Sequence, residues 1–123
     1  MFSIKSNQIE QQLSVTIQNL YDEEDLKTIA FIIDRELSNL SQGWTGAVDL
    51  RGMRVLEQKL THYINRIQTL FMDRGAERIV TLVDNAILKM QITRIGDQTG
   101  ITIRSAPRFT NEDEWKRALA RKT

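Results

Sequence analysis

Residues 44–50 read Trp-Thr-Gly-Ala-Val-Asp-Leu, a short apolar run that does not alternate with polar residues. Such a run is typical of a strand that is covered on both faces, as in the middle of a parallel sheet. Arg51 and Gly52 follow it, and a helical pattern begins shortly afterwards. This stretch therefore predicts a central parallel strand whose carboxyl end leads through a short loop into a helix.

Amphipathic helices are predicted on either side of this strand. Before it, an acidic segment that begins at Asp22 provides an N-cap and a first turn rich in carboxylates, which the positive end of a helix dipole favours. Apolar residues then recur with helical spacing, so residues 22–41 are predicted to form a helix that Gly43 stops. After the strand, a second apolar stripe covers residues 56–71 and ends at Gly75, a residue type that commonly terminates helices.

Two further segments extend the predicted sheet. Apolar and polar residues alternate at positions 2–4 and again at positions 13–17, which is the pattern of two half-buried strands in a hairpin. Residues 79–83 read Ile-Val-Thr-Leu-Val and predict another buried strand. Either Asp84 or Asn85 is a suitable cap for a third helix, which would end between Gly96 and Gly100.

The last part of the chain predicts one more strand and one more helix. Ile101 and Ile103 indicate a strand, which Pro107 would end. Residues 110–113 resemble a capping box before a final helix that carries Trp115. The order of elements is therefore ββαβαβαβα. We predict an α/β fold with a mixed sheet that has a parallel core and an N-terminal hairpin, in a single domain spanning residues 1–123.

The amino-acid composition argues against several classes of partner and site. The 123 residues include 17 Lys and Arg against 16 Asp and Glu, and this near balance does not favour nucleic acid as a partner. With no cysteine and one histidine, disulfides, thiolate sites and the usual zinc sites are excluded. The chain shows no secretory signal and no apolar stretch long enough for a membrane span, so we expect a cytoplasmic protein without a cofactor.

Nine residues are predicted to meet at the carboxyl edge of the parallel strands, where ligands of open α/β sheets usually bind. They are Asp49, Arg51, Gly52, Met53, Arg54, Asp84, Asn85, Ser105 and Arg108. For the two aspartates three interpretations are open: they could hold a magnesium ion, they could share a proton, or each could cap backbone N–H groups near a helix start. No motif of a familiar catalytic class is present in the sequence, and we predict no enzyme.

Some apolar residues fall outside the stripes of their predicted helices. Phe31 and Met72 lie opposite the apolar stripes of the first two helices, and Ile87 and Met90 lie away from that of the third. Exposed apolar residues that cluster indicate a contact surface, which could serve a protein partner, a second copy of the chain or an apolar ligand.

The segment Val48-Asp49-Leu50-Arg51-Gly52-Met53, together with the order of elements, resembles the STAS domains of bacterial anti-sigma-factor antagonists. Within that fold, the chain looks most like the antagonist-like (STAS/SEC14-like) branch. Members that are phosphorylated carry Asp-Ser/Thr-x-Gly-aliphatic here. In this chain Asp49, Gly52 and Met53 match that motif, whereas Leu50 occupies the phosphoacceptor position and has no hydroxyl. The resemblance implies a binding module that contacts its partner through this loop.

Three functional hypotheses follow. The first is a non-enzymatic regulatory module that binds a protein partner through Asp49, Arg51, Gly52, Met53 and Arg54, extended by Ile87 and Met90. The second is a carrier or sensor that binds a lipid or another apolar small molecule between the sheet and a helix. The third is a metal enzyme that uses Asp49 and Asp84.

Overall fold

The computed structural model describes residues 1–19, 22–99 and 103–121. Within these residues, five strands form one sheet in the order β1-β2-β3-β4-β5, and only the pair β1 and β2 is antiparallel. The strands are β1 (Phe2–Asn7), β2 (Gln12–Ile17), β3 (Trp44–Asp49), β4 (Ala76–Leu82) and β5 (Arg108–Phe109). The predicted order of elements is confirmed, as is the mixed sheet with an N-terminal hairpin.

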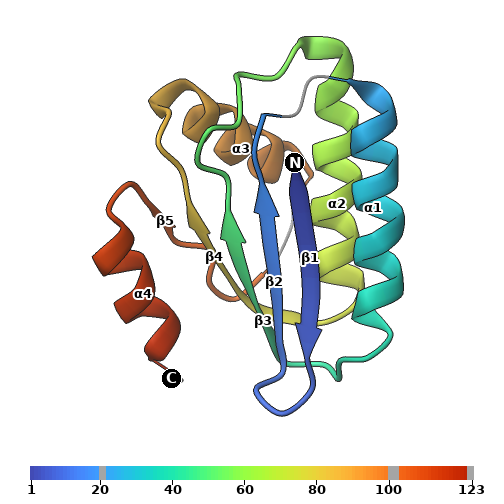
Figure 1. Ribbon diagram of the computed structural model, residues 1–123, viewed down its shortest axis with the longest axis vertical. Helices are drawn as coiled ribbons and strands as arrows, with labels where there is room; N and C mark the ends of the chain where they lie inside the picture. The colour runs from blue at the N-terminus through green and yellow to red at the C-terminus, as the bar shows by residue number, and fades with distance from the viewer. Residues whose placement is uncertain (20–21, 100–102, 122–123) are drawn as a thin grey trace.

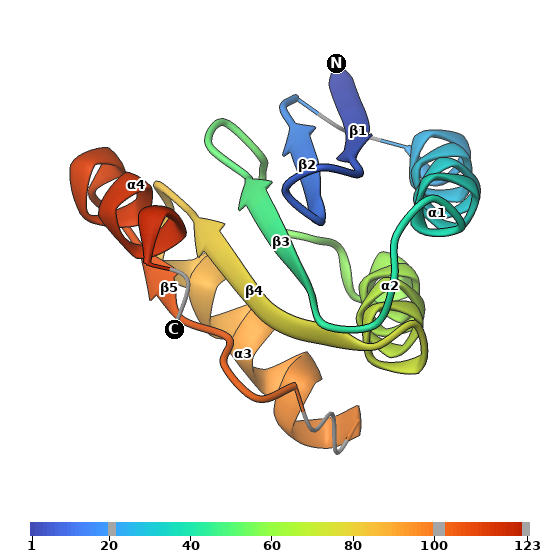
Figure 2. The same ribbon diagram turned by 90° about the horizontal axis from the view of Figure 1, so that it is seen from below.

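The helices cover the two faces of the sheet unequally (Figures 1 and 2). They are α1 (Glu23–Leu37), α2 (Thr61–Asp73), α3 (Ala86–Thr99) and α4 (Glu112–Ala120), and a 3-10 turn, η1 (Gln58–Leu60), precedes α2. Figure 2 shows α1, α2 and α3 on one side of the sheet and α4 on the other. Because right-handed crossovers that always advance in one direction place their helices on one face, this layering follows from the strand order. No helix in the described ranges has the length and apolar character to cross a membrane.

The hydrophobic core lies between the sheet and these three helices. Leu13, Val15 and Ile17 of β2 are buried while Ser14 between them is exposed, as the alternation predicted. β3 is the middle strand of the sheet, and its Trp44 side chain is completely buried. The stretch that predicted a central covered strand therefore occupies that place.

Side-chain caps start α1 and α3 as the sequence predicted. The Asp22 carboxylate accepts a hydrogen bond from the backbone N–H of Asp25 at the start of α1. Of the two residues that could cap α3, Asn85 does so, since its side chain accepts from Ile87 and Leu88. The orphan N–H groups of a helix start are thus satisfied within the chain, which fixes where α3 begins beside β4.

The last strand differs from the prediction. Of the two residues expected to form it, Ile101 lies outside the described residues, and Ile103 packs against the core without joining a strand. The chain pairs with β4 further on, where Thr81 N–H donates to the Pro107 carbonyl and β5 follows at once. Proline is tolerated here because β5 is an edge strand, and Pro107 has to supply only an acceptor to its neighbour.

The second predicted helix begins later than expected. Residues 50–57 form an irregular segment, and the α-helix starts only at Thr61. Leu56 is buried, but it reaches the core from this segment, whose backbone at Leu56 both donates to and accepts from the Gln91 side chain of α3. The apolar character of Leu56 therefore reflects burial of a loop, which helical spacing alone could not distinguish from a first helical turn.

Candidate functional site

The segment 50–57, called here the β3 loop, leaves the carboxyl end of β3 beside the start of α3 (Figure 1). Arg51 holds it to the sheet. Its Nε and Nη2 donate to the two carboxylate oxygens of Asp49 at 3.0 and 2.8 Å, and its backbone N–H donates to Oδ1 at 3.1 Å. Its Nη1 reaches Glu112, the first residue of α4, at 3.0 Å. One arginine thus links the loop, β3 and α4.

The charges in this network stabilise one another. Burial raises the pKa of the Asp49 carboxyl, but hydrogen bonds from the side chain and backbone of Arg51, with its positive charge, outweigh this and leave that pKa below its ordinary value. The pKa of Arg51 is raised, chiefly by the hydrogen bond to Asp49. Lys116 and Arg51 lower the pKa of Glu112. The loop is therefore held by groups that stay charged near neutral pH.

A second carboxylate fixes the turn of the β3 loop. Gly52 has a φ of 80°, a region that favours glycine, and its N–H donates to the Asp84 carboxylate at 3.1 to 3.2 Å. The Gly52 carbonyl accepts from the N–H of Asn19, which follows β2. The loop is thus hydrogen-bonded to the segments that follow β2 and β4, the two strands beside β3.

The two aspartates act separately. Asp49 is bound by Arg51 and Asp84 by the N–H of Gly52, so each satisfies backbone donors of the β3 loop rather than of a helix. Within the described ranges, no group of three or more histidine, aspartate or glutamate side chains could hold a metal ion. The metal hypothesis has no ligand cluster there to rest on.

The remaining residues predicted for partner binding divide into exposed and buried ones. Ile87 and Met90, on the outer side of α3, are 59% and 62% exposed, and Arg54 in the β3 loop is exposed as well. Met53 is 3% exposed and belongs to the core, so its side chain packs inside the protein and is not accessible to a partner. Met53 was expected in the contact because it matches the aliphatic position of the related motif, but the structure places it in the core.

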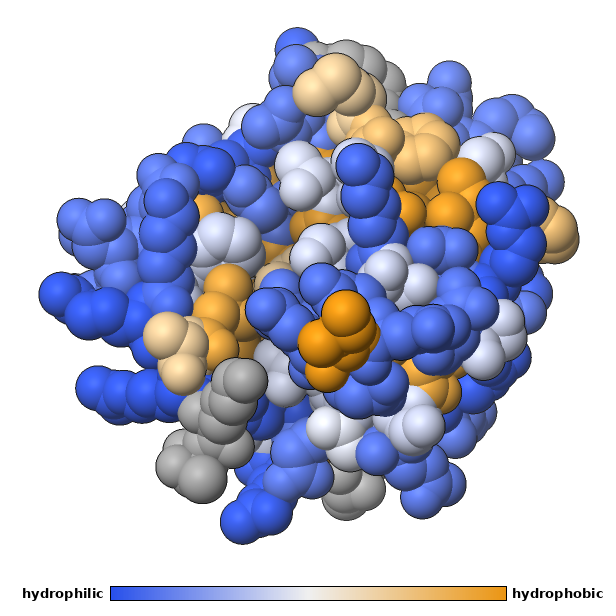
Figure 3. Space-filling model, turned by 60° about the horizontal axis from the view of Figure 1, so that its bottom comes forward, coloured by the Kyte–Doolittle hydropathy of each residue, from blue (hydrophilic) through white to orange (hydrophobic). Residues whose placement is uncertain are grey.

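Two other residues were expected at this edge, and only Arg108 lies near it. Ser105 pairs with Arg78 near the amino end of β4, whereas Arg108 begins β5 opposite Thr81, one residue before the end of β4. Both positions follow from the later start of the last strand. Figure 3 shows the amino end of the parallel strands, which is mostly hydrophilic, with hydrophobic residues in small separate groups.

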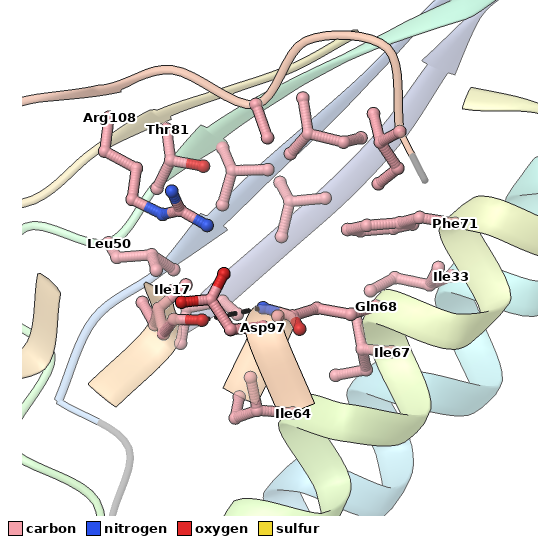
Figure 4. A pocket seen from close by; sticks show the side chains of 17 residues that line it. Ile17, Ile33, Leu50, Ile64, Ile67, Gln68, Phe71, Thr81, Asp97 and Arg108 are labelled. Carbon is pink, nitrogen blue, oxygen red and sulfur yellow. Dashed lines mark hydrogen bonds between the residues drawn. The ribbon is translucent and has the colours of Figure 1, made fainter. Parts of the chain in front are cut away.

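A pocket of about 250 Å³ lies between the sheet, α2 and α3. Its walls are mainly aliphatic and aromatic, with Val15, Val48, Ile67, Phe71, Ile79 and Ile92 among them. Leu50, at the phosphoacceptor position of the related motif, also lines it. The lining side chains, among them Leu50, Ile67 and Phe71, surround a shared space (Figure 4), which we call the core pocket. Such apolar walls suit a small apolar molecule or the apolar part of a larger one.

The core pocket has one polar end, where Gln68, Asp97 and Arg108 meet (Figure 4). Gln68 Nε2 donates to the Ile92 carbonyl at 3.3 Å, while its Oε1 is buried and no donor of the described residues reaches it. Burial lowers the pKa of Arg108, and the negative charge of Asp97 partly opposes this. Among the described residues, no hydrogen bond or ion pair holds that guanidinium.

Because Arg108 is partly desolvated without a bound acceptor, Arg108→Met should raise the free energy of unfolding by about 1 kcal/mol. Arg78→Met is a matched control on the neighbouring strand, where the guanidinium donates to the Ala118 and Leu119 carbonyls. That variant should lower the free energy of unfolding by about 1 kcal/mol. Urea denaturation followed by circular dichroism measures both, and equal losses in the two variants would contradict the desolvation of Arg108.

Sequence reasoning selected Arg108 but missed Gln68 and Gly96. Both lie on the apolar stripes of their helices, Gln68 four residues after Ile64 and Gly96 four residues after Ile92. A polar or very small residue inside an apolar stripe was the available signal, because buried polar groups normally need a reason to be there.

The comparisons with known proteins give one informative match. No protein-family model matches the sequence, and no curated protein matches it significantly. Among solved structures, the chain is similar to a serine-to-glutamate variant of RsbS from Moorella thermoacetica, a STAS-domain protein, with 14% identity and a TM-score of 0.62 over 98% of both chains. At this identity the match carries the fold alone, and it agrees with the order of strands and helices above. The chain therefore has the STAS fold.

Proposed function

We propose that the protein is a non-enzymatic regulatory module of the STAS type that binds a protein partner through the β3 loop and the adjoining face of α3. We call this the loop–α3 surface, with Arg51, Gly52 and Arg54 from the loop and Ile87 and Met90 from the helix. The observation that carries the proposal is the exposure of Ile87 and Met90 on a helix that the loop contacts directly.

The chemistry of this surface supports protein recognition. Exposed large apolar residues grouped on one element mark interaction sites more often than scattered ones do, and arginine is enriched at interfaces. The β3 loop is held in one conformation by Asp49 and Asp84, so a partner would meet a prearranged surface and lose less conformational entropy on binding. Asp49 supports the surface from within, since it is only 8% exposed.

The identity of Leu50 shapes the proposal. In the related motif this position receives a phosphate, but leucine has no hydroxyl, and the Leu50 side chain is buried. We infer that partner binding in this protein is not switched by phosphorylation at residue 50. A cytoplasmic location remains a prediction from the sequence.

The double variant Ile87→Asp, Met90→Asp tests the proposed surface. Placing two carboxylates in an apolar contact should weaken partner binding at least about tenfold, because their desolvation would not be compensated. The tagged protein is purified from its own host, co-purifying proteins are quantified by mass spectrometry, and affinity for the candidate is measured by calorimetry with purified components.

Phe31→Asp provides the matched control, because Phe31 is a large apolar residue that is 67% exposed on α1, a different helix. It should leave partner affinity unchanged. A loss in the Phe31 variant with none in the double variant would place the contact on α1 and overturn the proposal. Sedimentation of the wild-type chain identifies the case in which the partner is a second copy.

The core pocket favours a second candidate function, a carrier or sensor of an apolar small molecule. The pocket is lined mostly by apolar side chains and is partly open to solvent. A bound apolar molecule would remove this apolar surface from water, which is favourable. We therefore propose that the pocket is a ligand site.

A further inference from the structure

We infer that the core pocket takes a medium-chain hydroxycarboxylate, with its apolar chain among the aliphatic side chains and its head group between Arg108 and Gln68. The inference rests on the second candidate function, that the pocket binds a ligand, and it specifies the chemical class. It combines three observations: the size of the pocket, the two polar groups at one end, and a glycine between them.

The size of the pocket sets the length of the chain. An apolar cavity of about 150 Å³ is known to hold benzene, which has six carbons. In proportion, the core pocket of about 250 Å³ has room for roughly ten non-hydrogen atoms. Its deeper walls come from β2, β3 and α2 and consist of side chains such as Val15, Val48 and Phe71, which offer no hydrogen bonds to a ligand. The buried part of the ligand is therefore a hydrocarbon chain of about eight carbons.

The polar side chains at one end of the core pocket determine which head group of a ligand would fit there. The Arg108 guanidinium has only donors, and a carboxylate is the acceptor that matches its planar geometry. Gln68 Oε1 is buried, accepts from no described residue, and needs a donor, which a carboxylate cannot be. A hydroxyl close to the carboxylate supplies it. Asp97 also lines this end, and a carboxylate there disfavours a head group with two negative charges more than a head group with one.

Gly96 of α3 leaves room for that head group. A Cβ built on Gly96 would lie 3.6 Å from Gln68 Oε1 and 3.7 Å from Arg108 Nη2. A single point beside the Gly96 backbone therefore lies near both polar groups at once. Any side chain at residue 96 would occupy this point, whereas glycine keeps it open to a ligand.

The test is isothermal titration calorimetry of the purified chain, freed of bound molecules by organic extraction and refolding, with octanoate, 3-hydroxyoctanoate and octan-1-ol. The expected order of affinity is 3-hydroxyoctanoate, then octanoate at least about threefold weaker, then octan-1-ol. Arg108→Met should lower the affinity for both carboxylates about tenfold or more, and it should change the affinity for octan-1-ol little. Arg104→Met, which removes an exposed arginine paired with Glu77, should leave the affinities for all three probes unchanged.

Gly96→Ala separates binding from folding. The added methyl group makes ordinary contacts and improves helix propensity, so the variant should fold at least as stably as the wild type. It should nevertheless lower the affinity for 3-hydroxyoctanoate at least about threefold, because the methyl group occupies the space of the head group.

The outcomes distinguish the two levels of the proposal. If octan-1-ol binds as tightly as the carboxylates and Arg108→Met changes nothing, the pocket is a ligand site but the assigned head group is wrong. If no probe binds, and methyl resonances of Ile67 and Ile92 do not shift in nuclear magnetic resonance spectra, the ligand site itself is refuted. Neither result would affect the loop–α3 surface.

Discussion

Trp44→Ala is expected to lower the free energy of unfolding by about 4 kcal/mol. Trp44 is fully buried in the central strand, its ring packs edge-on against Phe71 at 5.5 Å, and its Nε1 donates to the Arg74 carbonyl at 2.9 Å. Truncation removes this packing, leaves a cavity and deprives a carbonyl of its donor. Urea denaturation followed by circular dichroism measures the loss.

Trp115→Ala is the matched control for this prediction. Trp115 Nε1 also donates to a backbone carbonyl at 2.9 Å, that of Val80, but its ring is only partly buried and α4 has no fully buried residue. The hydrogen bond is equivalent and the burial is smaller, so the expected loss is about 2 kcal/mol. Equal losses in the two variants would contradict the assignment of the core to the face that α1, α2 and α3 cover.

Asp49→Ala is expected to lower the free energy of unfolding by about 3 kcal/mol at pH 7. The Asp49 carboxylate, whose side chain is 11% exposed, accepts three hydrogen bonds from Arg51, and its removal leaves those donors without their acceptor. Arg51 keeps Glu112 and some contact with solvent, which limits the loss. Asp34→Ala, which breaks a more exposed ion pair with Arg74, should cost less than about 1 kcal/mol.

The effect of Asp49 depends on pH in a defined direction. Because the folded-state pKa of Asp49 is below its ordinary value of about 3.9, the stabilisation is complete above that value and is lost as pH falls through the folded-state pKa. The difference between wild type and Asp49→Ala should therefore be constant from about pH 5 to 7 and shrink below about pH 4. Denaturation at pH 7, 5 and 3 tests this, and a difference that grew towards pH 3 would contradict the network.

Local sequence patterns predicted most of the fold because each of them has a local cause. The alternation around Val15 and the cap at Asp22 depend on neighbours in the chain, and both appear in the structure as expected. Leu56 and Met53 were misplaced because burial in an irregular loop leaves no periodic signature. The last strand was misplaced because an apolar residue such as Ile103, which packs against the core from a loop, resembles a strand residue, whereas the pairing with β4 runs through Ser105, Pro107 and β5.

The candidate sites were predictable to different degrees. The rule that ligands bind at the carboxyl edge of parallel strands selected Asp49, Arg51 and Gly52, which the structure brings together. The core pocket could not be predicted in this way, because it depends on how α2 and α3 pack over the sheet. The relation of Gln68 to Gly96 exists only in three dimensions.

Site-specific photo-crosslinking tests the central claim, that the loop–α3 surface binds a protein partner, most directly. A photoreactive amino acid is placed at position 90 or, as a control, at position 31 of the chain in its own host, and crosslinked proteins are identified by mass spectrometry. The account predicts that one defined protein crosslinks from position 90 and not from position 31, and that Ile87→Asp removes the product. Crosslinking of that protein from position 31 alone, or no defined product from position 90, would contradict it.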